Sequence, residues 1–525
     1  MPITQLGQIN TTALVVPDLY VQIVPPQNIV INGVNTGIVG VVGTASYGPV
    51  NVATILSGTA DLTRNFGPVM ARNFDLATPV VTAIQQGASS FFAVRVTDGT
   101  DVAATGSVST AGATVGLILT AIYTGSFGNN VAASIVTGSK AGSYAAVITC
   151  PGQPAERFDN ITGTAGALWT NFAAAINGGN ATRGPSQIVV AAAGASVTLP
   201  NVGTVYAFAA GTDGATGVTA STLVGVDAVG ARTGMYALRG KGCSVGVLSD
   251  TFDATTWTLQ VAFGLSEGVY MMLTGPKGDT ITNAIAAKAT AGLDSYAAKL
   301  HFGDWLYWND TTNALPTRLV SPQGFAAGKL ANMSPERSTL NKPLFGIVGS
   351  QRLGLAGSAQ QNAYSAFELS LLFAAGIDVI TNPGAGGLAV WTERAGHNSS
   401  SNAATGGDNY TRMTNYIAAT LSVGMGVFVG RVINSALFFD VRSTLLSFLQ
   451  GMLGQNQLGS TDGSTPFGVV CDISNNPAAR TGNGYVQADV QVRYQAINEK
   501  FIVNLEGGQT VNVARQTTAS GQVSQ

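Results

Sequence analysis

The chain has 525 residues, enough for several domains, and its formal net charge at pH 7 is -2. Charged residues make up 10 % of the sequence and hydrophobic residues 46 %, whereas ordinary globular chains carry about 25 % charged residues. So few charges leave two classes, a membrane protein or a subunit whose surface is covered by neighbours, and the absence of a basic patch argues against nucleic-acid binding.

The sequence carries no segment typical of membrane insertion. Its longest apolar stretch, residues 417–430, is interrupted by glycine and is shorter than the ~20 residues of a spanning helix. The first basic residue is Arg64, so a signal peptide with a basic start is not expected. Cys150, Cys243 and Cys471 are scattered, which gives no disulfide framework and no metal pair and favours a reducing compartment such as the cytoplasm. We therefore expect a covered subunit without membrane insertion, metal or cofactor.

Residues 1–28 form an extended arm with a single charge, Asp18. The arm is either an ordinary first strand with a frayed end or a strand offered to a neighbouring molecule. We favour the second interpretation, because Pro25 and Pro26 stiffen an extended exit from the body of the protein. The apolar residues expected to make this contact are Leu14, Val16, Leu19, Val21 and Ile23.

Residues 29–98 have the pattern of the first part of an α/β core. We expect strands at residues 37–43 and 91–96, and helices beginning near Asp61 and spanning residues 79–86. The glycines of residues 37–43 could be mistaken for a dinucleotide-binding loop. Their spacing differs from that motif and no helix opens after them, so a buried strand is predicted.

Residues 99–230 change to a composition of Ala, Gly, Thr, Val and Ser with almost no charge. Short β-type runs alternate there with glycine turns, which predicts one β-rich domain inserted between two parts of the core. We expect strands at residues 115–122, 131–136, 145–149 and 188–192 and a helix at residues 168–176.

Residues 231–421 return to alternating strands and helices. Strands are expected at residues 243–248, 269–273 and 306–308, and helices at residues 255–265, 280–291, 323–332 and 364–375. This alternation predicts a mostly parallel sheet covered by helices, and therefore a mixed α/β, multidomain protein.

Residues 422–500 predict a small C-terminal domain of one helix and a sheet, followed by a C-terminal arm at residues 501–525. The helix spans residues 432–452, where apolar residues recur at spacings of three and four. Strands are expected from Phe467 and over residues 486–494. The alternating apolar residues near the end are Val490, Val492, Phe501, Val503 and Leu505. Two or three strands need partners, so we expect further strands from elsewhere in the chain or from another copy.

Several segments resemble contractile tail sheath proteins of myovirus-type tailed bacteriophages. They include residues 36–51, 91–96, 320–328, 382–391, 470–475 and 499–505. The resemblance implies a subunit that polymerises as stacked rings around an inner tail tube and shortens to drive the tube through the host envelope. It also implies as partners other copies of the chain, the tube protein, and baseplate and tail terminator proteins, in a virion tail assembled in the host cytoplasm.

The core of this family is likened to a subtilisin-type α/β fold, and a protease of that type needs Ser, His and Asp side chains in a fixed geometry. The chain has two histidines, His301 and His397, and no Gly-x-Ser-x-Gly motif surrounds a candidate nucleophile. Trp305, Tyr307 and Trp308 lie at strand spacing and are expected in the core rather than in a ligand site. We therefore predict no catalytic residue and no enzyme activity.

Two hypotheses about assembly follow. The sheet at residues 486–494 receives the N-terminal arm of one neighbour and residues 501–513 of another, and Arg431 and Arg442 on the 432–452 helix face the tube. The alternatives are the sheath of a bacteriocin-like or other contractile injection particle, and a passive self-assembling surface or shell protein.

Overall fold

The computed structural model describes residues 3–6, 20–23, 31–110, 112–164, 166–181, 183–355, 362–382, 390–505, 507 and 509. It divides into two units, Met1–Gln495 and Ala496–Gln525, which are described separately. The first unit combines a largely parallel sheet, several antiparallel sheets and helices, so the predicted mixed α/β, multidomain class is confirmed.

A seven-stranded sheet forms the centre of the first unit, with the order β20-β15-β14-β13-β3-β5-β4. Neighbouring strands are parallel except β4, which runs antiparallel to β5. The strands are β3 (Ile38–Gly43), β4 (Thr54–Leu56), β5 (Ser90–Arg95), β13 (Val245–Leu248), β14 (Tyr270–Thr274), β15 (Ala298–His301) and β20 (Ile377–Asp378). Their apolar runs suit a parallel sheet that is buried on both faces, and the predicted mostly parallel sheet is confirmed.

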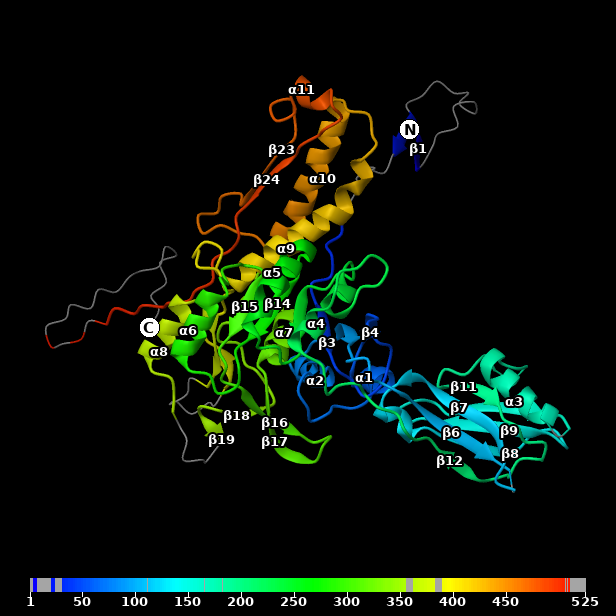
Figure 1. Ribbon diagram of the computed structural model, residues 1–525. Helices are drawn as coiled ribbons and strands as arrows, with labels where there is room; N and C mark the ends of the chain where they lie inside the picture. Colours follow the sequence, from blue (N-terminus) through cyan, green and yellow to red (C-terminus); the bar gives the residue numbers. More distant parts are fainter. Residues whose placement is uncertain are drawn as a thin grey trace. The chain divides into compact units, whose positions relative to one another are not determined.

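Helices cover both faces of this sheet (Figure 1). Val41 of β3 belongs to one buried cluster and its neighbour Val42 to another, because successive side chains of a strand point to opposite faces. The first cluster packs under α1 (Thr59–Phe66), α2 (Ala77–Gln85) and α7 (Gln323–Ala331). The second packs under α4 (Ala220–Val224), α5 (Trp257–Glu267), α6 (Ile281–Thr290) and α8 (Ala366–Ala374), with the short helices η3 (Gly234–Leu238) and η4 (Ala254–Thr256).

The strand predicted at residues 306–308 exists, but it does not join the parallel sheet. It is β16 (Leu306–Asp310), in an antiparallel sheet with β17 (Leu315–Val320), β18 (Ile347–Ser350) and β19 (Gly354–Leu355). Only a short turn separates β16 from β17, and such a turn permits antiparallel but not parallel pairing. Trp305 and Trp308 are buried, as expected for core residues.

In its described residues, the β-rich insertion contains two antiparallel sheets, one α-helix and one short helix. The four-stranded sheet contains β10 (Glu156–Ile161), β9 (Tyr144–Thr149), β8 (Ala132–Thr137) and β12 (Val205–Ala207). The three-stranded sheet contains β11 (Val189–Ala193), β7 (Val115–Thr124) and β6 (Ala103–Ser109), and η2 (Ser126–Asn130) follows β7. Trp169 and Phe172 of α3 (Gly166–Gly178) are fully buried in the core that these elements share. The predicted strands and helix are therefore present, each within a few residues of its expected ends.

The C-terminal part of the first unit consists of three helices, a short helical turn and two strands. They are α9 (Asp408–Gly424), η5 (Met425–Phe428), α10 (Ser435–Gly454), β23 (Phe467–Val470), α11 (Ala478–Thr481) and β24 (Asp489–Val492). The boundary predicted between residues 421 and 422 falls inside α9. Helix α10 begins after Asn434, whose side chain accepts a hydrogen bond from the backbone of Leu437, as an N-cap residue does.

Two further pairs of short strands complete the described elements: β1 (Ile3–Leu6) with β2 (Tyr20–Ile23), and β21 (Ile380–Thr381) with β22 (Thr392–Glu393). Across the ranges that the structure describes, no helix has the length and apolar character needed to cross a membrane.

Candidate assembly interface and buried ionic network

The C-terminal sheet pairs β23 with β24 in antiparallel register, with Phe467 opposite Val492 and Val469 opposite Val490. Its inner face packs on α10, which lies alongside both strands in Figure 1. Ala488, Val490, Val492 and Tyr494 all pack against the same apolar cluster, so the predicted alternation of this strand is confirmed. The strand itself is shorter than the predicted residues 486–494, because ladder bonds to β23 end at Asp489 and Val492.

The outer edges of β23 and β24 meet no further strand within the described ranges. An unpaired edge presents a row of backbone N–H and C=O groups that can pair with another chain. These edges are therefore the candidate assembly interface.

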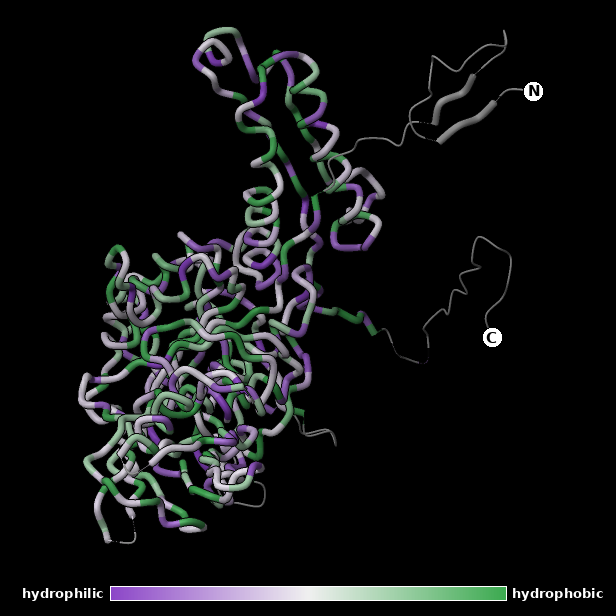
Figure 2. Tube along the Cα trace, turned by 90° about the vertical axis from the view of Figure 1, so that its right-hand side faces the viewer, coloured by the Kyte–Doolittle hydropathy of each residue, from purple (hydrophilic) through white to green (hydrophobic). Residues whose placement is uncertain are grey.

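The second unit shows exposed apolar residues and no strand in the part that is described. Phe501, Ile502, Val503 and Leu505 are between 69 % and 91 % exposed. Figure 2 shows this hydrophobic stretch as the green end of the chain before the grey trace to the C-terminus. The alternating residues Phe501, Val503 and Leu505 lie in no strand in the described part of the chain, because a strand needs a hydrogen-bonded partner and no described strand supplies one here.

The N-terminal arm is described only in part. Val21 and Ile23 lie in β2, which pairs in parallel with β1, with Ile3 opposite Tyr20. This pairing was not predicted from the sequence. Leu14, Val16 and Leu19 lie outside the described residues.

Arg431 and Arg442, the predicted tube-facing residues, both lie on the exposed surface near α10. Arg431 precedes the helix, lies 5.0 Å from the centre of the Phe428 ring, and pairs with Asp440 at 3.5 Å. Exposed apolar residues surround this region; they are Val423, Val427, Val429, Val432 and Phe439, between 52 % and 85 % exposed. Their contact with a tube stays a prediction.

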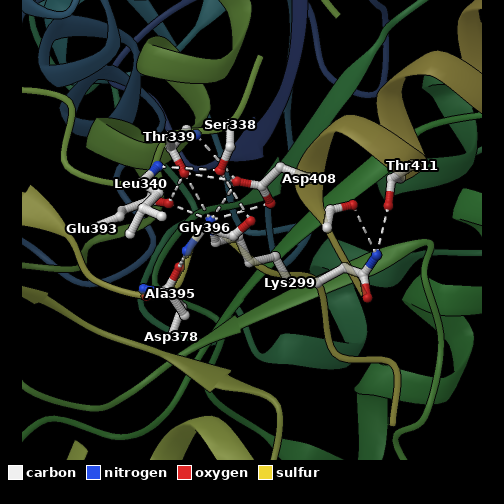
Figure 3. A network of polar contacts seen from close by, with 12 residues as sticks. Lys299, Ser338, Thr339, Leu340, Asp378, Glu393, Ala395, Gly396, Asp408 and Thr411 are labelled. Atoms are coloured by element: carbon white, nitrogen blue, oxygen red, sulfur yellow. Dashed lines mark hydrogen bonds and ion pairs between the residues drawn. The ribbon is translucent and has the colours of Figure 1, made fainter. Parts of the chain in front are cut away.

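The densest cluster of titratable groups lies inside the α/β core, around Lys299 of β15 (Figure 3). The Nζ atom of Lys299 lies 3.0 Å from Asp378 and 3.0 Å from Asp408, and it also contacts Glu393. All four side chains are fully buried. The cluster joins β15, β20 and β22 to the first residue of α9, the helix that leads to the C-terminal sheet.

Backbone and hydroxyl groups donate hydrogen bonds to two carboxylates of this ionic network, Asp378 and Asp408. Asp378 accepts hydrogen bonds from the backbone N–H groups of Ala395 and Gly396, both at 2.8 Å. Asp408 accepts a hydrogen bond from the hydroxyl of Tyr270 at 2.7 Å, and the Thr339 hydroxyl lies within hydrogen-bond distance of both Asp408 and Glu393. Together these contacts hold the charges in fixed positions.

Lys299 and the carboxylates of the network stabilise each other's ionised forms. Burial alone would lower the pKa of Lys299, but Asp408, Glu393 and Asp378 hold it well above its ordinary value. Burial alone would raise the pKa of Asp378, but Lys299 outweighs burial and lowers it to about 2. The pKa of Asp408 is also lowered, with burial again opposed by Lys299. Lys299, Asp378 and Asp408 are therefore charged at neutral pH.

This network was not predicted from the sequence, although the sequence carries one signal of it. Charged residues are rare in this chain, and Lys299 and Asp378 each lie inside a short apolar run of strand type. His301, one of the two histidines of the chain, is fully buried beside Glu393. In the described part of the chain, no group of three His, Cys, Asp or Glu residues is placed to hold a metal ion.

No protein-family model matches the sequence, and no curated protein matches it. Solved structures do match its fold. The sheath tail protein of Desulfitobacterium hafniense aligns with a TM-score of 0.55 and 14 % identity, over 86 % of this chain and 93 % of that one. The sheath tail protein Lin1278 of Listeria innocua aligns with a TM-score of 0.58 and 12 % identity, over 85 % and 90 %.

A third match is the PVC sheath complex of an extracellular contractile injection system in its contracted state. Its TM-score is 0.53 and its identity 11 %, over 95 % of this chain and 99 % of that one. At such low identities the likeness concerns the fold, and it spans nearly the whole chain. The chain therefore has the fold of contractile sheath proteins.

Proposed function

We propose that this chain is a non-enzymatic sheath subunit that polymerises as stacked rings around an inner tube and contracts to drive the tube through a cell envelope. The observation that carries the proposal is the fold match over 95 % of this chain and 99 % of the PVC sheath chain. The sequence resemblance to tail sheath proteins supports it independently, because it rests on local motifs rather than on the fold.

The surface of the protomer also supports assembly. Only 10 % of the residues are charged, and the apolar side chains around Arg431 and along residues 501–505 are exposed. Contiguous exposed apolar surface marks a contact with another molecule. In a polymer of stacked rings, neighbouring copies and the tube would cover it.

Strand exchange between copies is the proposed link. Ordering an arm of ~10 residues costs ~1–2 kcal/mol per residue, and its ladder hydrogen bonds return only ~0.5–1.5 kcal/mol each. Apolar side chains that become buried must contribute the rest, at ~1.5–3 kcal/mol each. We therefore propose that the arms carrying Leu14, Val16, Leu19, Val21 and Ile23, and Phe501, Val503 and Leu505, add to the open edges beside Val490 and Val492 of other copies.

A phage tail is the proposed setting, with the tube, baseplate and tail terminator proteins as partners. A free contractile injection particle is the second candidate, and the match to the PVC sheath favours it. In either setting the subunit would assemble in the cytoplasm of the producing cell.

Electron microscopy of the expressed protein tests the proposal. A sheath gives two tubular forms that differ in length and width, with acid or urea converting the long form to the short one. A passive shell protein gives a single form that does not convert. Deleting residues 1–20 should leave a folded body that builds no long tubes, and long tubes from that truncation would refute the arm hypothesis.

A further inference from the structure

A polar cleft of about 740 Å³ lies where the β-rich insertion joins the core. Its walls come from residues 72–74 of the core, from Thr100 and Ser126, and from residues 211–216 and 218 on the segment that returns from the insertion. Sites for small molecules in proteins usually measure ~300–1,000 Å³. The cleft is therefore large enough to hold a small organic molecule.

The cleft lies at the carboxyl ends of the central parallel strands. Thr44, directly after β3, donates its backbone N–H to the carbonyl of Phe74 at 2.7 Å. Arg95, the last residue of β5, donates to the carbonyl of Asp213 at 3.1 Å. The strand order also reverses here, because β5 lies on one side of β3 and the later strand β13 on the other. Open α/β sheets bind ligands at this position.

One wall of the cleft has an unusual backbone conformation. Phe74 lies in the left-handed region with a φ of 58°, which a bulky side chain rarely adopts. Such conformations persist only where the surrounding structure holds them, and they are concentrated at binding and catalytic sites. The loop at residues 72–74 is therefore held in a shape that its own sequence does not favour.

The formal charges of the lining cancel. Arg72 and Asp213 are the charged residues among those that line the cleft, and they form an ion pair through Nη1 and Oδ2. The other carboxylate oxygen, Oδ1, accepts a hydrogen bond from the backbone N–H of Ser126 at 2.6 Å. A lining without net charge does not attract an anion or a cation, so the geometry favours an uncharged ligand.

Several polar groups of the lining have no partner among the described residues. Nη2 of Arg72 is buried and makes no hydrogen bond there, although buried donors are almost always paired. An acceptor from outside the chain is therefore expected at this atom. Asn73 and Thr216 are exposed, and their side chains make no hydrogen bond within the described ranges. An amide and a hydroxyl each donate and accept, which suits a ligand whose groups do the same.

We propose that this cleft binds a saccharide, whose hydroxyl groups pair with Arg72, Asn73 and Thr216. A saccharide without acidic or amino groups is uncharged, and each of its hydroxyls can both donate and accept a hydrogen bond. An aliphatic ligand would bury these polar groups without partners, which costs free energy. This inference does not depend on the proposed sheath function.

Saturation-transfer NMR with the full chain tests the proposal. The probes are maltose and diacetylchitobiose as free saccharides, dextran as a glycan chain, and inorganic phosphate as a charged comparison. We expect at least one disaccharide to bind with a dissociation constant of ~10 mM or lower. Binding of dextran as well would assign a glycan chain as the ligand, and its absence a free saccharide. Binding of no saccharide, or of phosphate alone, would overturn the proposal.

Two variants test whether the saccharide occupies this cleft. Asn73→Ala and Thr216→Ala each remove a group that makes no hydrogen bond in the described protomer, so both proteins should fold. Each should weaken saccharide binding about fivefold, the value of one hydrogen bond. Asn201→Ala removes an exposed amide outside the lining and should bind as the wild type does. Unchanged binding in both lining variants would overturn the proposal.

Discussion

At the scale of single residues, Arg95 joins the β-rich insertion to the core. It is fully buried at the end of β5, and its guanidinium donates to the backbone carbonyls of Gly48 and Thr124 at 2.7 Å and of Asp213 at 3.1 Å. These carbonyls belong to a core loop, to the end of β7 and to the segment that returns from the insertion. One side chain therefore fixes three backbone segments at the junction.

Replacing Arg95 should weaken this junction. Arg95→Met leaves three carbonyls without their donor, and we expect a loss of ~2–4 kcal/mol in the free energy of unfolding. Limited proteolysis should also cut faster within residues 211–218. The control is Arg157→Met, which removes an exposed ion pair with Asp159 and should change stability by less than ~0.5 kcal/mol. Equal effects of the two substitutions would show that Arg95 has no special role.

A buried carboxyl group gives a prediction about acid stability. Burial raises the pKa of Asp75 to about 7, although hydrogen bonds from Thr78 and the charge of Arg72 oppose the rise. The folded pKa lies above the unfolded value of ~3.9, so the contribution of this group is fully present below about pH 4 and is lost as pH rises to about 7.

Asp75→Asn should remove that loss, because the amide keeps an acceptor for Thr78 and never ionises. We expect the variant to be more stable than the wild type at about pH 8 by ~1–3 kcal/mol, and to match or fall below it at about pH 4. Thermal unfolding over this pH range measures the difference. A variant that is less stable than the wild type at pH 8 would contradict the conclusion that burial of the ionised Asp75 carboxylate destabilises the protein at this pH.

At the scale of elements, glycine sets the distance between α2 and α7. A Cβ atom on Gly328 would lie 2.4 Å from the Cα atom of Ala83, so the two helices pack backbone against backbone. Gly328→Ala should therefore force them apart and destabilise the protein by ~1–3 kcal/mol. Gly451→Ala is the matched control in α10, where an added Cβ meets nothing within 4 Å and should stabilise the helix by up to ~1 kcal/mol. Calorimetry of both variants checks the opposite signs.

Helix α10 gives a prediction about the tube. Its inner face is buried at Leu437, Val441 and Leu445, whereas Arg442 is exposed. If this outer face contacts the tube, Arg442→Glu should prevent assembly on tubes while the protomer stays folded. Arg337→Glu makes the same charge change at a side chain that is 68 % exposed, and it should assemble normally. Sedimentation with purified tubes distinguishes the two, and normal assembly of Arg442→Glu would exclude the contact.

At the scale of the whole molecule, the C-terminal arm is expected to act between copies rather than within one. Phe501 is 83 % exposed, so Phe501→Asp should leave the unfolding temperature of the protomer unchanged. The same change should abolish long tubes in electron micrographs, because burying an unpaired carboxylate against the sheet of a neighbouring copy costs a large amount of free energy. Tyr485→Asp, at a residue that is 67 % exposed outside the strands, is the control and should leave the tubes intact.

The sequence predicted most elements because their signals are local. The spacing of Leu437, Val441 and Leu445 is enough to predict a helix, and the alternation of Val490 and Val492 is enough to predict a strand with one buried face. Those periodicities, together with the scarcity of charge, were sufficient for the fold class and for the expectation of a covered surface.

Only the tertiary structure decided which strands pair and which charges meet. Leu306 and Trp308 have the pattern of a strand in either sheet, and the antiparallel arrangement depends on a partner that their own residues do not specify. The ionic network brings together Lys299, Asp378 and Asp408, which are far apart in the sequence and carry no shared motif. Periodicity reports which face of an element is buried, whereas the partner across that face is set by packing of the whole chain.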